Sequence, residues 1–547
     1  MNEQTSVPET LSGNNALKYI SSGDFFVDQF GSVSKFFGQR LKGDIYKDMA
    51  EAWRKDPLTA LTFTFYLRTI TRVVHFSDGT KTSTVQKGQG LRHESIYRML
   101  WLSENHPEIF MKNLLLFLTV GSWKDIFVML SYDLIDNTWE NRKLDWNWMM
   151  TVILAGLQNP NISNLIKKYL PQIRVSSKCN TPSAKADNII AKRICFHLFG
   201  QKTSGNTYRD YRKFKTSGNA HEWQKLISKH LFDKINFDTI AGRALSQLVS
   251  SQFLKNNNLV DKYEAWLSSK PVVKFTGYPF ELFKHLALKE YQKKTIEAQF
   301  QMLLEQAKSK MDVTGYRPIA VLDISSSMES KVYIAGGKVS PQSSLSVAAA
   351  SALFFNEMYP ESAFYDTFLY FSTQCKSMDV DKGSIYQKYI SLMNPSGWGG
   401  STNLLSVFHY LADWRLSNPE VNEKLLPNMF VLFSDGEFNR VTSKEGQIVT
   451  NIQAGKQLLL DSGYSKEYVE SFGICFVDIP NTFYHRIPPP KFETFESTSN
   501  VFYFSGYDMS PLSFLFGIES FEKTSPKTAK ELFEAAMNQE VFNRIEL

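Results

Sequence analysis

The sequence predicts a two-domain protein, with an all-α helical-repeat array over residues 16–310 and a doubly wound α/β domain over residues 311–547. Residues 1–15 are polar and are expected to form a loose N-terminus. Two observations predict this division. A chain of 547 residues is longer than one hydrophobic core usually organises. The hydrophobic period also changes near residue 311, from spacings of three and four residues to short apolar runs that alternate with helical segments.

The first part is predicted to consist of short helices with brief connections and no strands. Asp56 and Pro57 form a helix start signal, because aspartate caps a helix and proline suits its first position. Each short helix must bury one face against the next, so we expect paired helices stacked in a curved array. Further helices are predicted at residues 95–105, 108–118, 123–133 and 146–157.

The second part alternates strands with helices, which predicts a parallel sheet with helices on both faces. The run Ile319, Ala320, Val321 and Leu322 is typical of a strand that is covered on both faces. The predicted strands are residues 319–322, 363–371, 429–433, 472–477 and 501–504. The predicted helices are residues 345–359, 404–414, 452–462 and 527–538.

The composition predicts a soluble protein of a reducing compartment. Hydrophobic residues make up 43% of the chain, and no segment has the uninterrupted apolar length that spans a membrane. The four cysteines are far apart and form no Cys-x-x-Cys pair, so neither a disulfide framework nor a zinc site is indicated. We therefore expect a cytoplasmic protein with no membrane partner, located in the virion or host cytoplasm if its source is viral.

Charge is distributed unevenly between the two parts. The whole chain has a net charge of +6 at pH 7, but residues 1–310 hold 43 Lys and Arg against 28 Asp and Glu, a net charge of +15. The remaining residues hold 18 against 27, a net charge of −9. A basic first part suits a nucleic-acid partner, and an acidic second part suits metal and protein contacts. Solubility alone would also account for a basic surface.

Oxygen-bearing side chains follow the first predicted strand directly. Asp323, Ser325 and Ser327 supply one carboxylate and two hydroxyls on the loop where an open α/β sheet places its ligand site. Such oxygen ligands suit a hard cation, so we predict Mg²⁺, with Ca²⁺ or Mn²⁺ also tolerated. The alternative interpretation is a solvated cluster of turn residues, because serine and aspartate gather in many turns.

Two later segments strengthen the prediction of a metal site. The glycine-rich loop SGWGGSTN at residues 396–403 carries Thr402 and precedes a predicted helix. The apolar run MFVLFSDGE at residues 429–437 is a predicted strand that ends in Asp435. Each segment therefore adds one more oxygen ligand to the set, Thr402 from a loop before a predicted helix and Asp435 from the end of a predicted strand.

Residues 192–215 combine cationic with aromatic side chains. Cations neutralise phosphates and flat rings stack on bases, so this segment is predicted to bind single-stranded RNA. The alternative is an amphipathic helix whose aromatic residues are core and whose cations are merely solvated. The candidate RNA-binding residues are Lys192, Arg193, Lys202, Arg209, Tyr211, Arg212, Lys213 and Lys215. A second polar segment, residues 80–94, has several cations around Gly88 and Gly90 and is a candidate for phosphate binding.

These segments together resemble a known architecture. The ordered set Asp323, Ser325, Ser327, Thr402 and Asp435 resembles the metal-ion-dependent adhesion site (MIDAS) of von Willebrand factor A domains. A helical array followed by such a domain resembles the Ro autoantigen type of protein, in which a TROVE module precedes a von Willebrand A domain. The chain is more similar still to a related uncharacterised family of plants, fungi and giant viruses with the same two-part layout.

That similarity extends over nearly the whole chain, although only the metal-site motifs are specific. Outside them it rests on AWRKDPLTALTFTFYLR at residues 52–68, residues 92–107, GSWKD at residues 121–125, YRK at residues 211–213 and FSG at residues 504–506. One segment departs from the family. Members are usually rich in glycine and arginine after the first long helix, whereas this chain has a different loop at residues 73–90.

The resemblance implies a HEAT-like helical array that binds RNA and a von Willebrand A (Rossmann-like) domain whose cation recruits an acidic protein ligand. In Ro-type proteins single-stranded RNA ends enter the helical ring and structured RNA binds its outer surface. We therefore expect a non-catalytic, ribonucleoprotein-like scaffold. The alternative is a metal-dependent protein-interaction or structural protein without RNA. A metal-dependent hydrolase is a third class, and it is disfavoured because no general base accompanies the five predicted ligands.

Overall fold

The computed structural model describes residues 24–32, 40–69, 72–75, 81–86, 88–137, 141–174, 179–200, 205–217, 222–270, 272–275, 277–284, 289–308, 317–334, 338–358, 360, 364–365, 367–380, 383–394, 399–400, 402–434, 441–442, 448–449, 451–479, 500–505 and 529–547. The chain groups into two units. One unit comprises Gly38–Thr239 with Ala536–Leu547, and the other comprises Met1–Phe37 with Ile240–Ala535. The helices that precede the sheet in sequence are thus divided between the two units.

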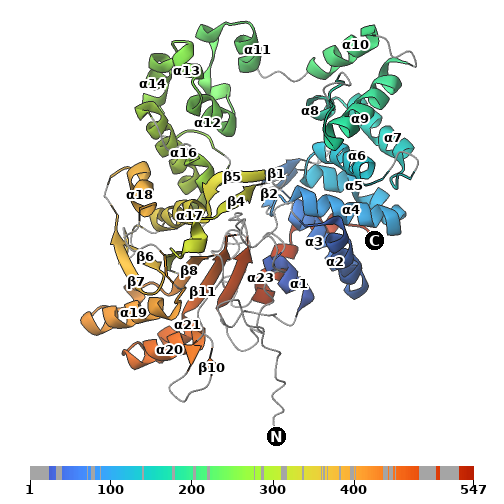
Figure 1. Ribbon diagram of the computed structural model, residues 1–547. Helices are drawn as coiled ribbons and strands as arrows, with labels where there is room; N and C mark the ends of the chain where they lie inside the picture. Colours follow the sequence, from blue (N-terminus) through green and yellow to red (C-terminus); the bar gives the residue numbers. More distant parts are fainter. Residues whose placement is uncertain are drawn as a thin grey trace. The chain divides into compact units, whose positions relative to one another are not determined.

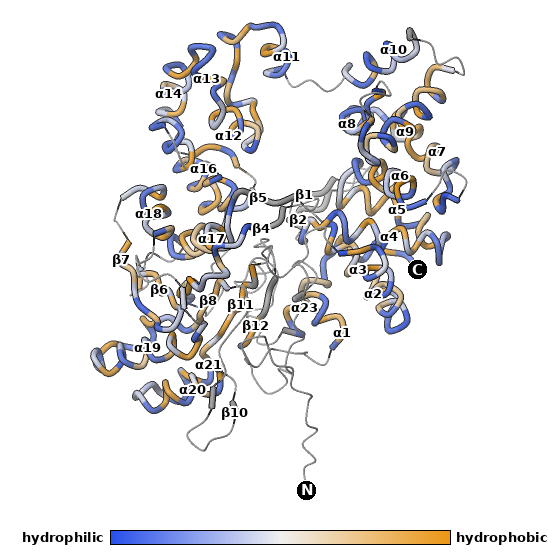
Figure 2. The backbone as a smooth tube through the Cα atoms, viewed as in Figure 1, coloured by the Kyte–Doolittle hydropathy of each residue, from blue (hydrophilic) through white to orange (hydrophobic). Residues whose placement is uncertain are grey.

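The unit of Gly38–Thr239 with Ala536–Leu547, here called the helical unit, consists mainly of helices, as predicted for the first part of the chain (Figure 1). Its helices differ in polarity, and α10 is mostly hydrophilic (Figure 2). The elements are α2 (Lys42–Lys55), α3 (Pro57–Arg68), β1 (Arg72–His75), β2 (Lys81–Gln86), α4 (Arg92–Asn105), α5 (Pro107–Val120), α6 (Lys124–Asp136), α7 (Trp146–Gln158), α8 (Ser163–Tyr169), α9 (Pro182–Phe199), α10 (Gly205–Thr216), α11 (Glu222–Ser228), η3 (Phe232–Lys234), η4 (Phe237–Thr239) and η8 (Glu540–Arg544).

The start of α3 shows how the sequence sets a helix boundary. Asp56, the predicted cap, accepts hydrogen bonds from the backbone N–H groups of Leu58 and Thr59, and Pro57 occupies the first helical position. Every residue from Ala60 to the end of α3 is buried, because α2, α4 and α5 pack around it. Helix α3 is therefore the centre of the helical unit.

The prediction that the first part contains no strands is wrong at one place. Strands β1 and β2 form an antiparallel hairpin, with Val73 opposite Val85. The sequences RVVH and KTSTVQ are rich in β-branched residues, which favour extended backbone. The hairpin falls within the segment where the sequence departs from its predicted family.

The second, the α/β unit, contains the sheet and the helices that cover it. Its elements are α1 (Phe25–Ser32), α12 (Gly242–Ser250), α13 (Phe253–Asn256), α14 (Val260–Ser268), α15 (Pro279–Leu282), α16 (Glu290–Lys308), β3 (Pro318–Asp323), η5 (Ser326–Glu329), β4 (Lys331–Ile334), β5 (Lys338–Ser343), α17 (Ser344–Met358), β6 (Thr367–Phe371), β7 (Cys375–Asp379), α18 (Ile385–Leu392), α19 (Leu405–Ser417), η6 (Glu423–Leu425), β8 (Met429–Ser434), β9 (Val441–Thr442), β10 (Ile448–Val449), α20 (Asn451–Asp461), α21 (Lys466–Ser471), β11 (Gly473–Asp478), β12 (Val501–Ser505) and α23 (Ala529–Met537). The predicted α/β character of the second part is confirmed.

Six strands form one mixed sheet in the order β12–β11–β8–β3–β6–β7. Each neighbouring pair is parallel except β6 and β7, which are antiparallel. The chain leaves β3 toward one edge of the sheet and returns at β8 to build the other edge. Open α/β sheets bind ligands at the carboxyl ends of the two strands that flank such a reversal. Asp323 ends β3 and Ser434 ends β8 at this reversal point.

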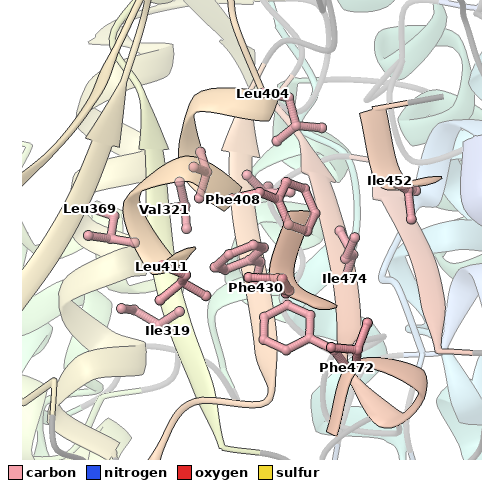
Figure 3. Packing of buried hydrophobic residues seen from close by; sticks show 14 of the residues in the cluster. Ile319, Val321, Leu369, Leu404, Phe408, Leu411, Phe430, Ile452, Phe472 and Ile474 are labelled. Carbon is pink, nitrogen blue, oxygen red and sulfur yellow. The ribbon is translucent and has the colours of Figure 1, made fainter. Parts of the chain in front are cut away.

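Helices cover both faces of this sheet. On one face α19, α20 and α21 pack against alternate strand residues to form a buried cluster (Figure 3). Within it the rings of Phe408 and Phe430 meet edge to face, with centroids 5.2 Å apart. On the other face α17 packs against β3 and β8, where the Phe355 and Phe433 rings lie 6.0 Å apart. Burial on both faces explains why the central strands have continuous apolar sequences.

Helices α15 and α16 belong to the α/β unit through contacts with α17 and α18. The rings of Phe283 and Tyr389 stack with centroids 4.0 Å apart. The Tyr386 backbone N–H also donates a hydrogen bond to the Glu297 carboxylate at 3.0 Å. No helix in the described parts of the chain is both long and apolar enough to cross a bilayer.

Candidate functional site

Asp323 is the centre of the predicted metal site and is completely buried, with 0% exposure. Its Oδ1 accepts a hydrogen bond from the Ser325 backbone N–H at 2.8 Å. Its Oδ2 accepts one from the Ser434 hydroxyl at 2.5 Å. The hydroxyl oxygens of Ser325 and Ser327 lie 3.1 Å apart. The structure therefore brings three of the five predicted ligands together at the carboxyl end of β3.

The loop that carries Thr402 packs against the Asp323 loop. The Gly399 backbone N–H donates to the carbonyl oxygen of Ile324 at 3.3 Å. Gly400 has a φ of +91°, and a Cβ there would lie 2.5 Å from the Thr373 hydroxyl oxygen, so glycine is required. Thr402 itself is 4% exposed. The glycine-rich loop thus lies against the Asp323 loop and carries a buried threonine.

The same loop is also hydrogen-bonded to the residues that follow β6. The Asn403 backbone N–H donates to the Ser372 carbonyl oxygen at 2.8 Å, and the Asn403 side-chain amide donates to the Thr373 carbonyl oxygen at 3.2 Å. Ser372 follows β6, which pairs with β3. Sheet pairing therefore determines the distance between the two loops.

Asp435 lies outside the described residues, but its neighbour Ser434 is described. Ser434 is the last residue of β8 and is 3% exposed. Sequence reasoning missed Ser434, because it ends an apolar run and reads as part of the strand. Its hydroxyl bond to Asp323 links the carboxyl ends of the two strands at the reversal point of the sheet.

Among the described residues, no cationic side chain is bonded to Asp323 or to the serines around it. Burial raises the pKa of Asp323, and hydrogen bonds from Ser434 and Ser325 oppose that rise. No salt bridge joins Asp323 to a Lys or Arg in the described parts of the chain. An ionised carboxylate that is buried among neutral donors is costly unless a cation compensates it. A divalent cation bound by oxygen ligands would supply that compensation.

The donor set identifies the class of metal that fits. Among the residues that the structure describes, no group of three or more His, Cys, Asp and Glu side chains is placed to hold a metal ion. The cluster around Asp323 instead offers hydroxyl oxygens, a carboxylate and backbone oxygens. Such ligands suit Mg²⁺, Ca²⁺ or Mn²⁺ and not zinc or iron held by sulfur and imidazole.

The predicted RNA-binding residues lie on α9 and α10, which pack against each other in the helical unit. Most of the cations are solvent-exposed, as a nucleic-acid surface requires. The exposed ones are Lys192, Arg193, Arg209, Arg212 and Lys213. Lys168 on α8 and Lys185 on α9 are also exposed and were missed, although the pair of lysines at residues 167–168 is a visible signal. Lys202 lies outside the described residues.

Tyr211 requires correction as an RNA contact. Tyr211 is 0% exposed, and its hydroxyl donates to the Pro171 carbonyl oxygen at 2.9 Å. A ring in the core has no free face for a base, so Tyr211 holds α10 in place. Lys215 is half-buried, and burial lowers its pKa while Asp187 opposes that change. Phe214 packs between Lys167 and Phe199, with its ring 4.6 Å from the Lys167 ammonium.

Two family models match parts of the chain. Residues 317–541 match the family described as "Domain of unknown function (DUF7788)". The matched segment begins one residue before β3. Residues 12–145 match the family described as "Domain of unknown function (DUF2828)". Neither description names a TROVE or von Willebrand A domain.

One curated relative is a giant-virus protein. The chain is similar to "Uncharacterized protein L728" of Acanthamoeba polyphaga mimivirus, with 25% identity over 284 residues. The match covers 48% of this chain and 45% of the relative, so the chain spans less than half of that protein's length. The similarity fits the predicted relation to a family with members in giant viruses.

Proposed function

We propose that the chain is a non-catalytic scaffold whose α/β unit is a von Willebrand A-type domain with a MIDAS-like cation site. The cation recruits an acidic side chain of a partner protein, and the exposed cations of α9 and α10 bind RNA. The main support is Asp323, a buried carboxylate with only neutral hydrogen-bond donors, located where the strand order reverses. The sheet order and the antiparallel edge strand β7 also support a domain of this type.

Five side chains would hold the cation in this proposal. Ser325, Ser327 and Thr402 would contribute hydroxyl oxygens, and Asp323 and Asp435 would contribute negative charge. When bound, the cation supplies a positive centre that accepts a carboxylate from outside the chain. The residues of this chain bind and orient the cation, and the buried position of Asp323 excludes water from one side of the site.

Cation binding is tested by titrating chelator-treated protein with Mn²⁺ in a calorimeter. The wild type is expected to bind one equivalent, and Asp323→Asn is expected to bind none. Asp413→Asn is the matched control, because Asp413 is exposed on α19 of the same unit. Equal binding by all three proteins would overturn the proposed site. A second titration with an acidic peptide, with and without Mn²⁺, checks that the cation recruits a carboxylate.

RNA binding is tested separately on α10. Reversal of Arg209, Arg212 and Lys213 to glutamate is expected to weaken binding of single-stranded RNA. Each lost phosphate contact should reduce the slope of log K against log salt by about 0.7. Reversal of Lys47, Arg54 and Lys55, three exposed cations of α2 in the same unit, is the matched control. Equal RNA retention by the two triple variants would mean that α10 does not bind RNA. That result would favour the alternative, a metal-dependent protein-interaction protein without RNA.

A further inference from the structure

A turn in the helical unit joins α3 to α4 and brings several buried polar groups together. The backbone N–H groups of Gln89, Gly90 and Leu91 donate to the carbonyl oxygens of Tyr66, Thr69 and Leu67 at 3.2, 3.0 and 2.7 Å. The turn therefore runs alongside the last turn of α3. Arg68 ends α3 and Arg92 begins α4 immediately after the turn.

Both arginines bind one carboxylate at the start of α6. The Arg68 Nε donates to Asp125 Oδ2 at 2.5 Å, and the Arg92 Nε donates to Asp125 Oδ1 at 2.7 Å. The side chains of Arg68 and Asp125 are 1% and 0% exposed, whereas that of Arg92 is 36% exposed. One side of the cluster is thus sealed, and Arg92 connects it to solvent.

Several polar atoms in this cluster have no hydrogen-bond partner among the residues that the structure describes. Arg68 Nη2 is buried and unpaired, although the Nε of the same guanidinium is bonded to Asp125. Gln89 is 1% exposed, and neither its amide nitrogen nor its amide oxygen has a partner. Buried polar groups in folded proteins are nearly always paired, so an unpaired donor on Arg68 at the end of α3 and another on Gln89 in the adjoining turn indicate a missing partner. The donors require an acceptor.

Charge favours an anionic acceptor. Two guanidinium groups share the single carboxylate of Asp125, which leaves one positive charge in excess. Lys124, the residue before Asp125, is one of three cations that act on Asp187: burial raises the pKa of that carboxyl group, and Arg174, Lys124 and Lys215 oppose the rise. Lys124 thus adds one more cation at the start of α6, next to the residue that the two guanidinium groups share.

Two glycines allow the close approach of these elements. A Cβ on Gly88 would lie 2.4 Å from the Tyr66 carbonyl oxygen. A Cβ on Gly121 would lie 2.7 Å from Asp125 Oδ2 and 2.9 Å from Arg68 Nε. The chain therefore has no side chain at the two positions where one would displace the turn or the ion pairs. Close packing of this kind fixes the guanidinium groups before any ligand arrives.

We propose that the turn at residues 88–92, with Arg68 and the first residues of α6, binds a phosphate group. A phosphate has several acceptor oxygens, and guanidinium groups bind it with charge-assisted hydrogen bonds. Arg92 meets the phosphate from the solvent side, and the unpaired donors of Arg68 and Gln89 lie behind it. The group comes either from free phosphate or from the end of an RNA. The site does not depend on the proposed RNA surface of α9 and α10, which lies on other helices.

The proposal is tested by titrating the full chain with inorganic phosphate in a calorimeter. Arg92→Gln removes the accessible guanidinium, and Arg54→Gln, an exposed arginine of α2, is the matched control. The wild type and Arg54→Gln are expected to bind phosphate equally. Arg92→Gln is expected to bind it at least about tenfold more weakly, since a hydrogen bond to a charged group is lost. Circular dichroism confirms that each variant is folded.

A second variant and a second probe sharpen the result. Gln89→Met keeps the length of the side chain but removes both unpaired amide atoms, so it is expected to weaken phosphate binding and raise the melting temperature of the phosphate-free protein. A short RNA with a 5′-phosphate, compared with the same RNA ending in a hydroxyl, distinguishes the two sources. Tighter binding of the phosphorylated RNA assigns the site to an RNA end, and binding of inorganic phosphate alone assigns it to the free ion. The proposal would be overturned if neither phosphate nor the phosphorylated RNA bound, or if Arg92→Gln and Arg54→Gln bound phosphate equally.

Discussion

Two fully buried aspartates, one in each unit, differ in the groups that surround their carboxylates. In the helical unit Asp125 forms ion pairs with Arg68 and Arg92. In the α/β unit Asp323 accepts hydrogen bonds from Ser325 and Ser434 and forms no ion pair within the described residues. Both carboxylates have 0% exposure. The same chemical group therefore lies beside excess positive charge in one unit and, as far as the described residues show, beside no positive charge in the other.

The difference is the one expected between a structural carboxylate and the ligand-binding carboxylate that we propose. A carboxylate between two guanidinium groups holds three helices together, because its removal leaves cations buried without a partner. A carboxylate among hydroxyls, at the ends of two parallel strands, leaves no buried cation unpaired when it is removed, and we propose that its charge serves a bound cation. Excess positive charge attracts an anion and excess negative charge a cation. The proposed phosphate and metal sites follow from this contrast.

Removal of the Asp125 charge is expected to have the largest effect. Asp125→Asn leaves Arg68 buried without an ionic partner, and the cost should be about 3–5 kcal/mol of unfolding free energy. Urea unfolding followed by circular dichroism measures this cost. Asp145→Asn is the control, because Asp145 caps α7 and asparagine caps equally well. If the two variants unfold at the same urea concentration, the Asp125 ion pairs do not stabilise the helical unit.

Crowding of the same ion pairs is expected to have an intermediate effect. Gly121→Ala places a methyl group 2.7 Å from Asp125 Oδ2 and 2.9 Å from the Arg68 side chain. Overpacking of this kind usually costs about 1–3 kcal/mol. Gly43→Ala is the control, because no atom lies within 4 Å of its added Cβ and alanine favours the helix α2. Melting temperatures should fall for the first variant and hold or rise for the second. A fall of equal size in both would mean that the close approach at Gly121 is not needed.

The sequence predicted the α/β unit better than the helical unit, and the reason is physical. Apolar runs such as residues 319–322 identify strands that are buried on both faces, and the polar residue that follows identifies the ligand edge. Asp323 could therefore be found from its position alone. Ser434 could not, because a serine at the end of an apolar run gives no sign of the carboxylate that it contacts from 111 residues away.

Edge strands and ion pairs gave weaker signals. Strand β7 reads CKSMD and strand β5 reads KVSPQS, so neither has the apolar run that predicts a strand. Strand β4, which pairs with β5 between the Asp323 loop and α17, has only four residues. Arg68 sits in the run LTALTFTFYLR, where a charged residue suggests an exposed helix end. Its partner Asp125 lies 57 residues away in sequence. Pairing at that separation depends on how α3 and α6 pack, which the local pattern does not encode.

The same change of side chain at Asp323 is expected to have the smallest effect on stability. Asp323→Asn strands no cation, keeps an acceptor for the Ser325 N–H, and removes a charge from a buried position. Weaker hydrogen bonds to asparagine lower the unfolding free energy, whereas removal of a buried charge raises it. These effects oppose each other, so the unfolding free energy of chelator-treated protein should change by about 1 kcal/mol or less. Urea unfolding under the conditions used for Asp125→Asn compares the two aspartates directly. A loss at Asp323 as large as that at Asp125 would mean that both carboxylates are structural, and the contrast between the two units would fail.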